Sequence, residues 1–134
     1  MVNVYRVDIL EDRLRELTES VPGILGTVIV SVEGFVVAAY PPADGDSSQS
    51  TSTPQVAAMA ATLIALGEQA LTRLAQGEIE RLLVEGHSGA MIVYPINRNA
   101  ALAAMVDKKA KLGLTLLTIS QAATFFGSIL SGAD

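Results

Sequence analysis

Few residues of this chain are of the types that do chemistry, and its single histidine is the first to consider. The 134 residues include one histidine, His87, and no cysteine. His87 falls in Gly86-His87-Ser88-Gly89, which is not the Gly-x-Ser-x-Gly turn that exposes a nucleophilic serine. Catalysis by a serine also needs a histidine that a third group holds in place. We therefore expect a solvated histidine in a turn and no catalytic residue.

The acidic residues are also poorly spaced for chemistry. Asp44-Gly45-Asp46 resembles the start of a calcium loop, but the later ligands and the terminal glutamate do not follow. Glu78 and Glu80 fall on a predicted strand, where a solvated face explains them better than a catalytic pair. The chain also lacks the Gly-x4-Gly-Lys-Ser/Thr loop that binds nucleotide phosphates. We predict no metal site, no cofactor and no enzymatic activity.

The charge balance argues against nucleic acid as a partner. The chain has 9 basic and 14 acidic residues and a formal net charge of −5. Phosphate binding needs clustered lysine and arginine, and the basic residues are scattered apart from Lys108, Lys109 and Lys111. The N-terminus shows no long apolar run behind a basic start, so a secretory signal is not expected. We expect a cytoplasmic protein.

One segment has the composition of a membrane anchor. Residues 112–133 carry no charge and follow a basic cluster, and a spanning helix needs about 20 mostly apolar residues. Spacing favours another interpretation, because polar residues gather on one side of the predicted helix and apolar residues on the other. The polar set is Ser120, Gln121, Thr124 and Ser128, and the apolar set is Leu116, Ile119, Ala123, Phe126 and Leu130. We predict an amphipathic helix packed on a sheet and no membrane span.

Hydrophobic periodicity and turn residues predict eight elements in one domain, residues 1–134. The predicted helices cover 7–20, 53–76 and 112–130, and the predicted strands cover 24–32, 35–40, 78–86, 90–96 and 100–106. Hairpins join successive strands, so we predict an α+β fold with an antiparallel sheet and helices on its faces. Between 41 and 53 the sequence is rich in Ser, Thr and Pro, which indicates a mobile loop.

The helix over 53–76 has an apolar stripe too wide for one contact. One edge of the stripe contains Met59, Leu63, Leu66, Ala70 and Leu74, and the other contains Ala57, Ala60, Ile64, Gly67 and Leu71. The second edge is rich in small residues, which allow close approach of another helix. We expect this edge to meet a partner, so that Gly67→Arg would break the contact and leave the fold intact. The alternative is a more deeply buried helix in a monomer.

Five segments together resemble the roadblock family, which includes dynein light chains and bacterial regulators of small GTPases. They are the LxxL of the first predicted helix, VPGILGTVIVSVEGFVVAA at 21–39, AAMAATLIALGEQAL at 57–71, LLVEGHSGAMIVYPI at 82–96 and AALAAMVDKKAKLGL at 100–114. The resemblance lies in their order and spacing along nearly the whole chain. It implies a longin-like sheet of five antiparallel strands, with the helix over 53–76 on one face and the other two helices on the opposite face.

The resemblance also implies partners. Family members form dimers through the strand matching 78–86 and the helix matching 53–76, and in bacterial relatives the paired helices dock small Ras-like GTPases in signalling and cell polarity. Some of these stimulate GTP hydrolysis by repositioning the switch regions, without an arginine of their own. The residues expected at the partner and dimer interface are Ala57, Ala60, Ala61, Ile64, Gly67, Glu68, Leu71, Ile79, Arg81 and Leu83.

We therefore expect a non-catalytic homodimer that regulates or holds a small GTPase, with Arg98 as a secondary contact. Two other functions remain open at this point. One is a structural adaptor that binds peptides by strand addition, as motor light chains do. The other is a small-molecule sensor module, which a sheet flanked by helices also fits. The sequence does not distinguish a homodimer from a heterodimer.

Overall fold

A computed structural model describes residues 4–41 and 53–131 of the chain. The elements are α1 (Val4–Ser20), β1 (Ile24–Ser31), β2 (Val36–Tyr40), α2 (Thr53–Arg73), β3 (Leu82–Glu85), β4 (Gly89–Pro95), β5 (Ala100–Asp107) and α3 (Leu112–Ser131). The predicted order of helices and strands is confirmed. The loop predicted over 41–53 lies, from residue 42 to 52, outside the described residues.

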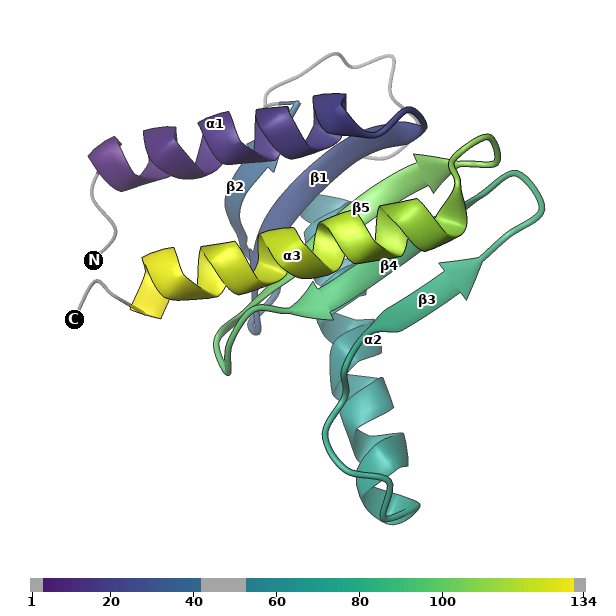
Figure 1. Cartoon of the computed structure of the whole chain (residues 1–134). Helices are drawn as coiled ribbons and strands as arrows, with labels where there is room; N and C mark the ends of the chain where they lie inside the picture. Colours follow the sequence, from purple (N-terminus) through teal and green to yellow (C-terminus); the bar gives the residue numbers. More distant parts are fainter. Residues whose placement is uncertain (1–3, 42–52, 132–134) are drawn as a thin grey trace.

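The five strands form one antiparallel sheet in the order β2-β1-β5-β4-β3 (Figure 1). β5 is the central strand, between β1 and β4, and its register with β1 pairs Val28 with Ala103 and Val30 with Ala101. Short turns at 32–35, 86–88 and 96–99 close three hairpins, and Gly34 takes a φ of 96° in the turn between β1 and β2, as expected for a glycine there. β3 is shorter than the predicted strand over 78–86, and it forms one edge of the sheet.

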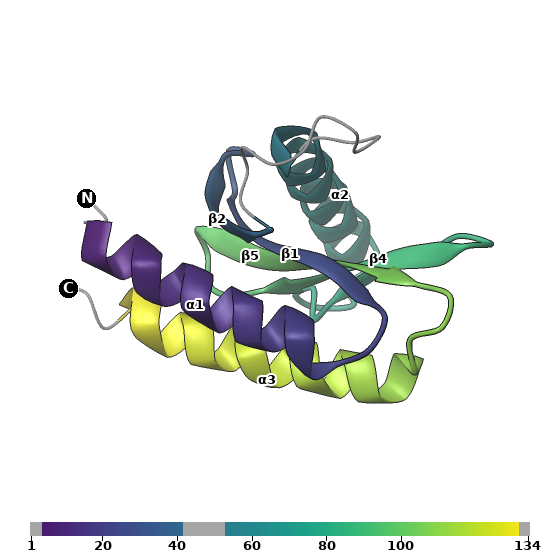
Figure 2. The same cartoon turned by 90° about the horizontal axis from the view of Figure 1, so that it is seen from above.

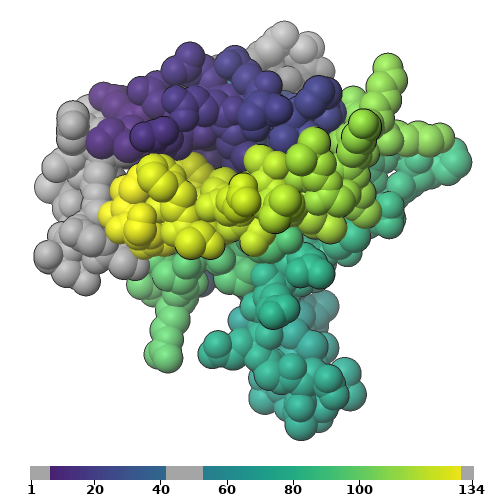
Figure 3. All heavy atoms as spheres, viewed as in Figure 1, coloured from purple at the N-terminus to yellow at the C-terminus, as the bar shows by residue number. Residues whose placement is uncertain are grey.

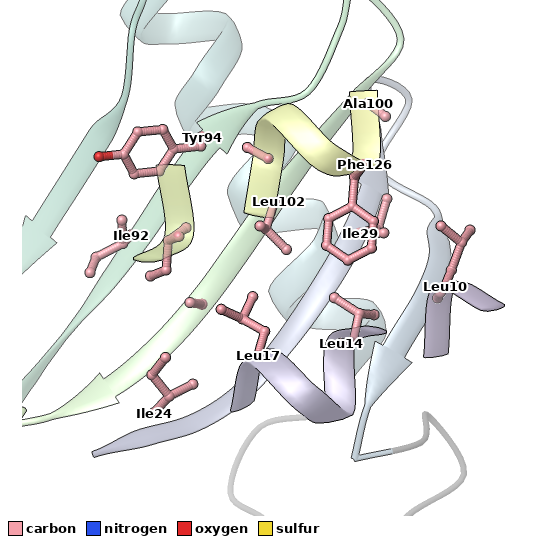
Figure 4. Close-up of a cluster of buried hydrophobic side chains, with 14 of the residues drawn as sticks. Leu10, Leu14, Leu17, Ile24, Ile29, Ile92, Tyr94, Ala100, Leu102 and Phe126 are labelled. Carbon is pink, nitrogen blue, oxygen red and sulfur yellow. The ribbon is translucent and has the colours of Figure 1, made fainter. Parts of the chain in front are cut away.

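α1 and α3 lie side by side on one face of the sheet, and α2 lies on the other (Figure 2). Leu10, Leu14 and Leu17 of α1 meet Ile119 and Phe126 of α3 over the sheet, in a cluster that Figure 4 shows in close-up. Spacings of three and four place these residues on one side of each helix. The arrangement implied by the resemblance is therefore observed.

The second core cluster joins α2 to the opposite face. Val56, Ala57 and Ala60 pack on Val28, Val93, Ala101 and other small residues of the sheet. Alanine on both surfaces lets the helix approach the strands closely. Burial ends there, because no residue of α2 after Ala60 is buried. The rest of the helix projects beyond the sheet as a separate lobe (Figure 3).

α2 ends earlier than predicted, and by a different device. The helix was predicted to reach residue 76, directly before Gly77, but it ends at Arg73. Ala75 takes the left-handed conformation, with a φ of 56°. The amide of Gln76 donates to the carbonyl of Leu71 at 2.9 Å, and the amide of Ala75 donates to Thr72 at 3.2 Å. This is the Schellman arrangement, with alanine where glycine is usual.

α3 is the one described helix that is long and apolar enough to cross a membrane, over Leu112–Leu130. It packs on the sheet as predicted, with Thr115, Ile119 and Phe126 fully or almost fully buried. The prediction of a polar outer side was incomplete. Leu114, Leu117 and Phe125 are exposed on that side, between the expected serine, threonine and glutamine residues.

Candidate protein interface

The large apolar side chains that are exposed fall into three groups among the described residues. Three lie at the ends of β1 and in the turn that follows it (Leu25, Val32 and Phe35), and three lie on α3 (Leu114, Leu117 and Phe125). The remaining five belong to α2, the residue after it, and β3: Met59, Leu66, Leu74, Leu83 and Val84. The third group covers adjacent elements and forms the largest gathering of exposed apolar residues. We call it the α2–β3 surface.

The C-terminal part of α2 contributes to the α2–β3 surface because it extends beyond the sheet. Leu66 is 61% exposed and Leu74 is 66% exposed, although burial of a leucine side chain is normally favourable. Helical spacing places Met59, Leu66 and Ala70 together on one flank of α2, next to the residues that pack on the sheet. Burying a leucine side chain is worth about 1.5–3 kcal/mol, so a partner that covers this side has a substantial driving force.

β3 adds an unpaired strand edge to the same surface. Its four residues pair with β4, from Leu82 opposite Val93 to Glu85 opposite Ala90, and within the described residues no strand pairs with the other side of β3. Such an edge offers free amide and carbonyl groups to another chain. Leu83 and Val84 are exposed beside it, so strand addition here would also bury apolar side chains.

The ten residues that were expected at the interface differ in their exposure to solvent. Ala57 and Ala60 are fully buried against the sheet, and Ile79 is also buried. These three side chains support α2 from inside and present no surface to a partner. Arg81 and Leu83 are exposed, while five more are half-buried: Ala61, Ile64, Gly67, Glu68 and Leu71.

Gly67 faces the chain's own residues, which corrects the expected effect of its substitution. A Cβ at Gly67 would lie 3.0 Å from Cδ1 of Ile79 and 4.0 Å from Cδ1 of Leu82. Ile79 is buried, so an arginine at Gly67 would displace it from the segment that leads into β3. The substitution therefore tests the fold as much as a partner contact.

Four exposed apolar residues were not predicted at the interface: Met59 and Leu66 on α2, Leu74 directly after it, and Val84 on β3. The first three belong to the bulkier edge of the stripe. Both edges of the stripe were visible in the periodicity. The edge with small residues was assigned to a partner because small residues permit close helix packing. In the structure the same property serves the contact between α2 and the sheet, and the bulkier edge is left exposed.

A groove runs along the opposite side of α2. Its volume is about 270 Å³, and its walls come from α2, the end of β1, and the turn between β4 and β5. Ala61, Ala65 and Glu68 line it from α2, and Arg98 lines it from the turn. The groove is apolar along its floor, with one acidic and one basic side chain at its walls. Phe35, which is 70% exposed, lies in the neighbouring turn, where Gly34 approaches Ala58 of α2.

Reactive chemistry has little support in the described residues. His87 lies exposed in the turn between β3 and β4, as predicted. Across residues 4–41 and 53–131, no three His, Asp or Glu side chains gather to hold a metal ion. The buried hydroxyls have simple partners: Thr27 is 2.8 Å from the hydroxyl of Thr18, and Thr115 donates to the carbonyl of Lys111 at 2.7 Å.

Comparisons with known proteins agree with this architecture. The family model of the Roadblock/LC7 domain matches residues 10–105. The chain is 27% identical over 112 residues to uncharacterized protein MJ0310 of Methanocaldococcus jannaschii, which covers 84% of this chain and 92% of that protein.

Solved structures show the same fold. A Roadblock/LC7 domain from Streptomyces avermitilis superposes with a TM-score of 0.79 at 22% identity, over 90% of this chain and 97% of that one. A structure described as MglB with tetrameric arrangement gives a TM-score of 0.84 at 17% identity, over 100% and 96%. The match to the family model covers most of this chain, and the chain belongs to the Roadblock/LC7 domain family.

Proposed function

We propose that the protein is a non-catalytic regulator or scaffold of a small Ras-like GTPase, and that it acts in the cytoplasm as a homodimer. The observation that carries the proposal is the α2–β3 surface, where an apolar helix face and an unpaired strand edge lie exposed on adjacent elements. A contiguous apolar patch of this kind marks an interaction site more often than a chance feature. The roadblock resemblance implies both the dimer and the GTPase.

Pairing of two copies through the α2–β3 surface accounts for its two features at once. A two-fold axis beside β3 would let the β3 edges of both copies pair and continue the sheet across the dimer. The same axis would bring the projecting ends of α2 together, because the interface in a two-fold dimer is the same patch on both chains. Leu66 and Leu74 would then be covered, and Leu83 and Arg81 would lie at the strand junction.

GTPase docking is assigned to the other side of α2. The groove lined by Ala61, Ala65 and Glu68 stays accessible when the α2–β3 surface is covered, because it opens toward the turn between β4 and β5. Arg98 and Glu68 give it charged walls, and Phe35 offers an apolar anchor nearby. Exposed aromatic and arginine side chains are the residue types that most often dominate binding energy.

The test is capture of GTPases from a lysate of the source cell, loaded with a non-hydrolysable GTP analogue or with GDP. The purified chain serves as bait, and bound proteins are identified by mass spectrometry. We expect a small GTPase to be retained in the GTP state and to be lost with Ala65→Arg, which fills the groove from an exposed position. Ala65→Arg should leave the mass of the dimer unchanged, since its side chain lies away from the α2–β3 surface.

Two results would contradict the proposal. Capture of the same proteins in both nucleotide states, with Ala65→Arg without effect, would favour the structural adaptor that binds peptides along β3. Absence of any small GTPase from the captured proteins would remove the GTPase from the account, while leaving the dimer to be tested separately.

A further inference from the structure

The outer side of α3 is the second exposed apolar surface, and it lies on the face of the sheet opposite α2 (Figure 2). Leu117 is 57% exposed, Leu114 is 50% exposed and Phe125 is 41% exposed. Residues 112–131 contain no charged side chain. A helix on the surface of a chain with a net charge of −5 normally carries charge on its outer side. The absence of charge here needs an explanation.

Seven residues on the outer side of α3, six of them exposed and Thr118 half-buried, are arranged symmetrically about Gln121. Leu117 and Phe125 lie four residues on either side of it, Thr118 and Thr124 three residues on either side, and Leu114 and Ser128 seven residues on either side. All seven positions fall on one side of a helix with 3.6 residues per turn. Gln121 is also at the middle of the helix, which runs from Leu112 to Ser131. We call these seven residues the α3 stripe. From Gln121 toward either end of the helix, the stripe shows first a threonine and then a large apolar residue.

We propose that this stripe binds the α3 stripe of a second copy of the chain, antiparallel and about a two-fold axis at Gln121. In such an interface each residue meets the symmetry-related position of its partner. Leu117 of each copy would lie against Phe125 of the other, so that two aromatic rings are buried, one from each copy. The two Gln121 side chains would meet on the axis, where an amide can donate to and accept from its own copy.

The local charge does not oppose a second copy as the occupant, and the symmetry about Gln121 is what favours one. Two chains of net charge −5 repel each other, and the stripe is an uncharged surface on which they can meet. Arg13, a charge beside the stripe, is already engaged within its own chain, since its guanidinium lies 4.9 Å from the centre of the Phe125 ring and 3.0 Å from the carboxylate of Glu16. Antiparallel pairing also places Lys111 beside the negative end of the partner's helix dipole.

The association is expected to be weak. Stable interfaces bury more than about 1,000 Å² in total, and two 20-residue helices about 30 Å long reach that size only with help from their flanks. We expect a Kd in the micromolar range or above. The stripe lies on the opposite face of the sheet from the α2–β3 surface, so its association adds to the proposed dimer and does not compete with it.

The register is tested by crosslinking, for which the absence of cysteine from the chain is an advantage. Gln121→Cys is expected to crosslink to itself through a short bifunctional thiol reagent. Ser128→Cys alone should not, because its mate is Leu114, but a mixture of Ser128→Cys and Leu114→Cys should. Equal crosslinking of Gln121→Cys and Ser128→Cys, or none in either, would overturn the proposal.

The occupant is tested with Leu117→Glu and a matched control, Leu25→Glu, which changes a leucine of similar exposure (59%) on β1. Sedimentation at high protein concentration should show that Leu117→Glu raises the Kd of the association at least about tenfold, and that Leu25→Glu leaves it unchanged. Equal effects of the two variants would contradict the proposal. So would binding of the wild-type chain to vesicles of anionic and zwitterionic lipid that Leu117→Glu abolishes, since a lipid surface would then be the occupant.

Discussion

Replacement of Ala75 by glycine is expected to stabilise the protein. Ala75 holds the left-handed position that ends α2, with a φ of 56°, and two hydrogen bonds from Ala75 and Gln76 depend on that conformation. An L-residue with a Cβ pays about 1–2 kcal/mol in this region. Glycine adopts it without steric penalty, so Ala75→Gly removes strain from the end of the helix.

The expected gain is the difference between two terms. Removal of the strain contributes about 1–2 kcal/mol, while the greater freedom of glycine in the unfolded chain opposes folding by roughly 0.5–1 kcal/mol. The net gain in the free energy of unfolding is therefore centred on about 0.75 kcal/mol and does not exceed about 1.5 kcal/mol. With a urea m-value near 2 kcal/mol/M, the midpoint should rise by about 0.4 M.

The assay is urea unfolding followed by circular dichroism at one fixed protein concentration, with Ala70→Gly as the matched control. Ala70 is exposed in the body of the same helix, where glycine costs about 1 kcal/mol relative to alanine. If Ala70→Gly also weakens the proposed dimer, that effect lowers the urea midpoint as well. The same chemical change should thus raise the midpoint at one position and lower it at the other. Destabilisation by both substitutions would refute the reasoning.

Other predictions concern packing. Gly23→Ala should destabilise by about 2 kcal/mol or more, because the new Cβ would lie 2.7 Å from Cβ of Ala110 at a φ of 101°. Gly113→Ala, in open space at the start of α3, should instead be neutral or stabilise by up to about 1 kcal/mol; thermal melts of this pair check both signs, and equal losses would contradict them. Phe126→Ala should cost about 3–5 kcal/mol in denaturant unfolding, because its ring is almost fully buried between α3 and the sheet; a cost under 1 kcal/mol would mean that α3 does not belong to the core.

The order of elements and the sheet were predictable because each rests on a local signal. Alternation and turn residues located the strands, and the helical periodicity of apolar residues located the helices. Boundaries were less accurate where a long-range contact decides them. β3 begins at Leu82 and not at residue 78, because the segment before it packs through Ile79 on α2 near Gly67.

The candidate interface was predictable in its elements but not in its residues. The wide apolar stripe on α2 predicts that each of its two edges packs against another element or another chain. The stripe alone does not show which edge packs on the sheet of the same chain. Ala57 and Ala60 pack on alanines of β5, a pairing that depends on the register between distant segments. The overhang of α2 beyond the sheet is likewise a property of the assembled fold.

Pairing of two copies through the α2–β3 surface is tested by sedimentation equilibrium at low micromolar concentration. One chain has a mass of 14.0 kDa. We expect the wild type and Leu25→Glu to sediment at twice that mass, and Leu66→Glu to sediment as a single folded chain, because an exposed leucine is changed at the centre of the proposed interface. A wild type that sediments as one chain, or a Leu66→Glu variant with the mass of the wild type, would contradict the account.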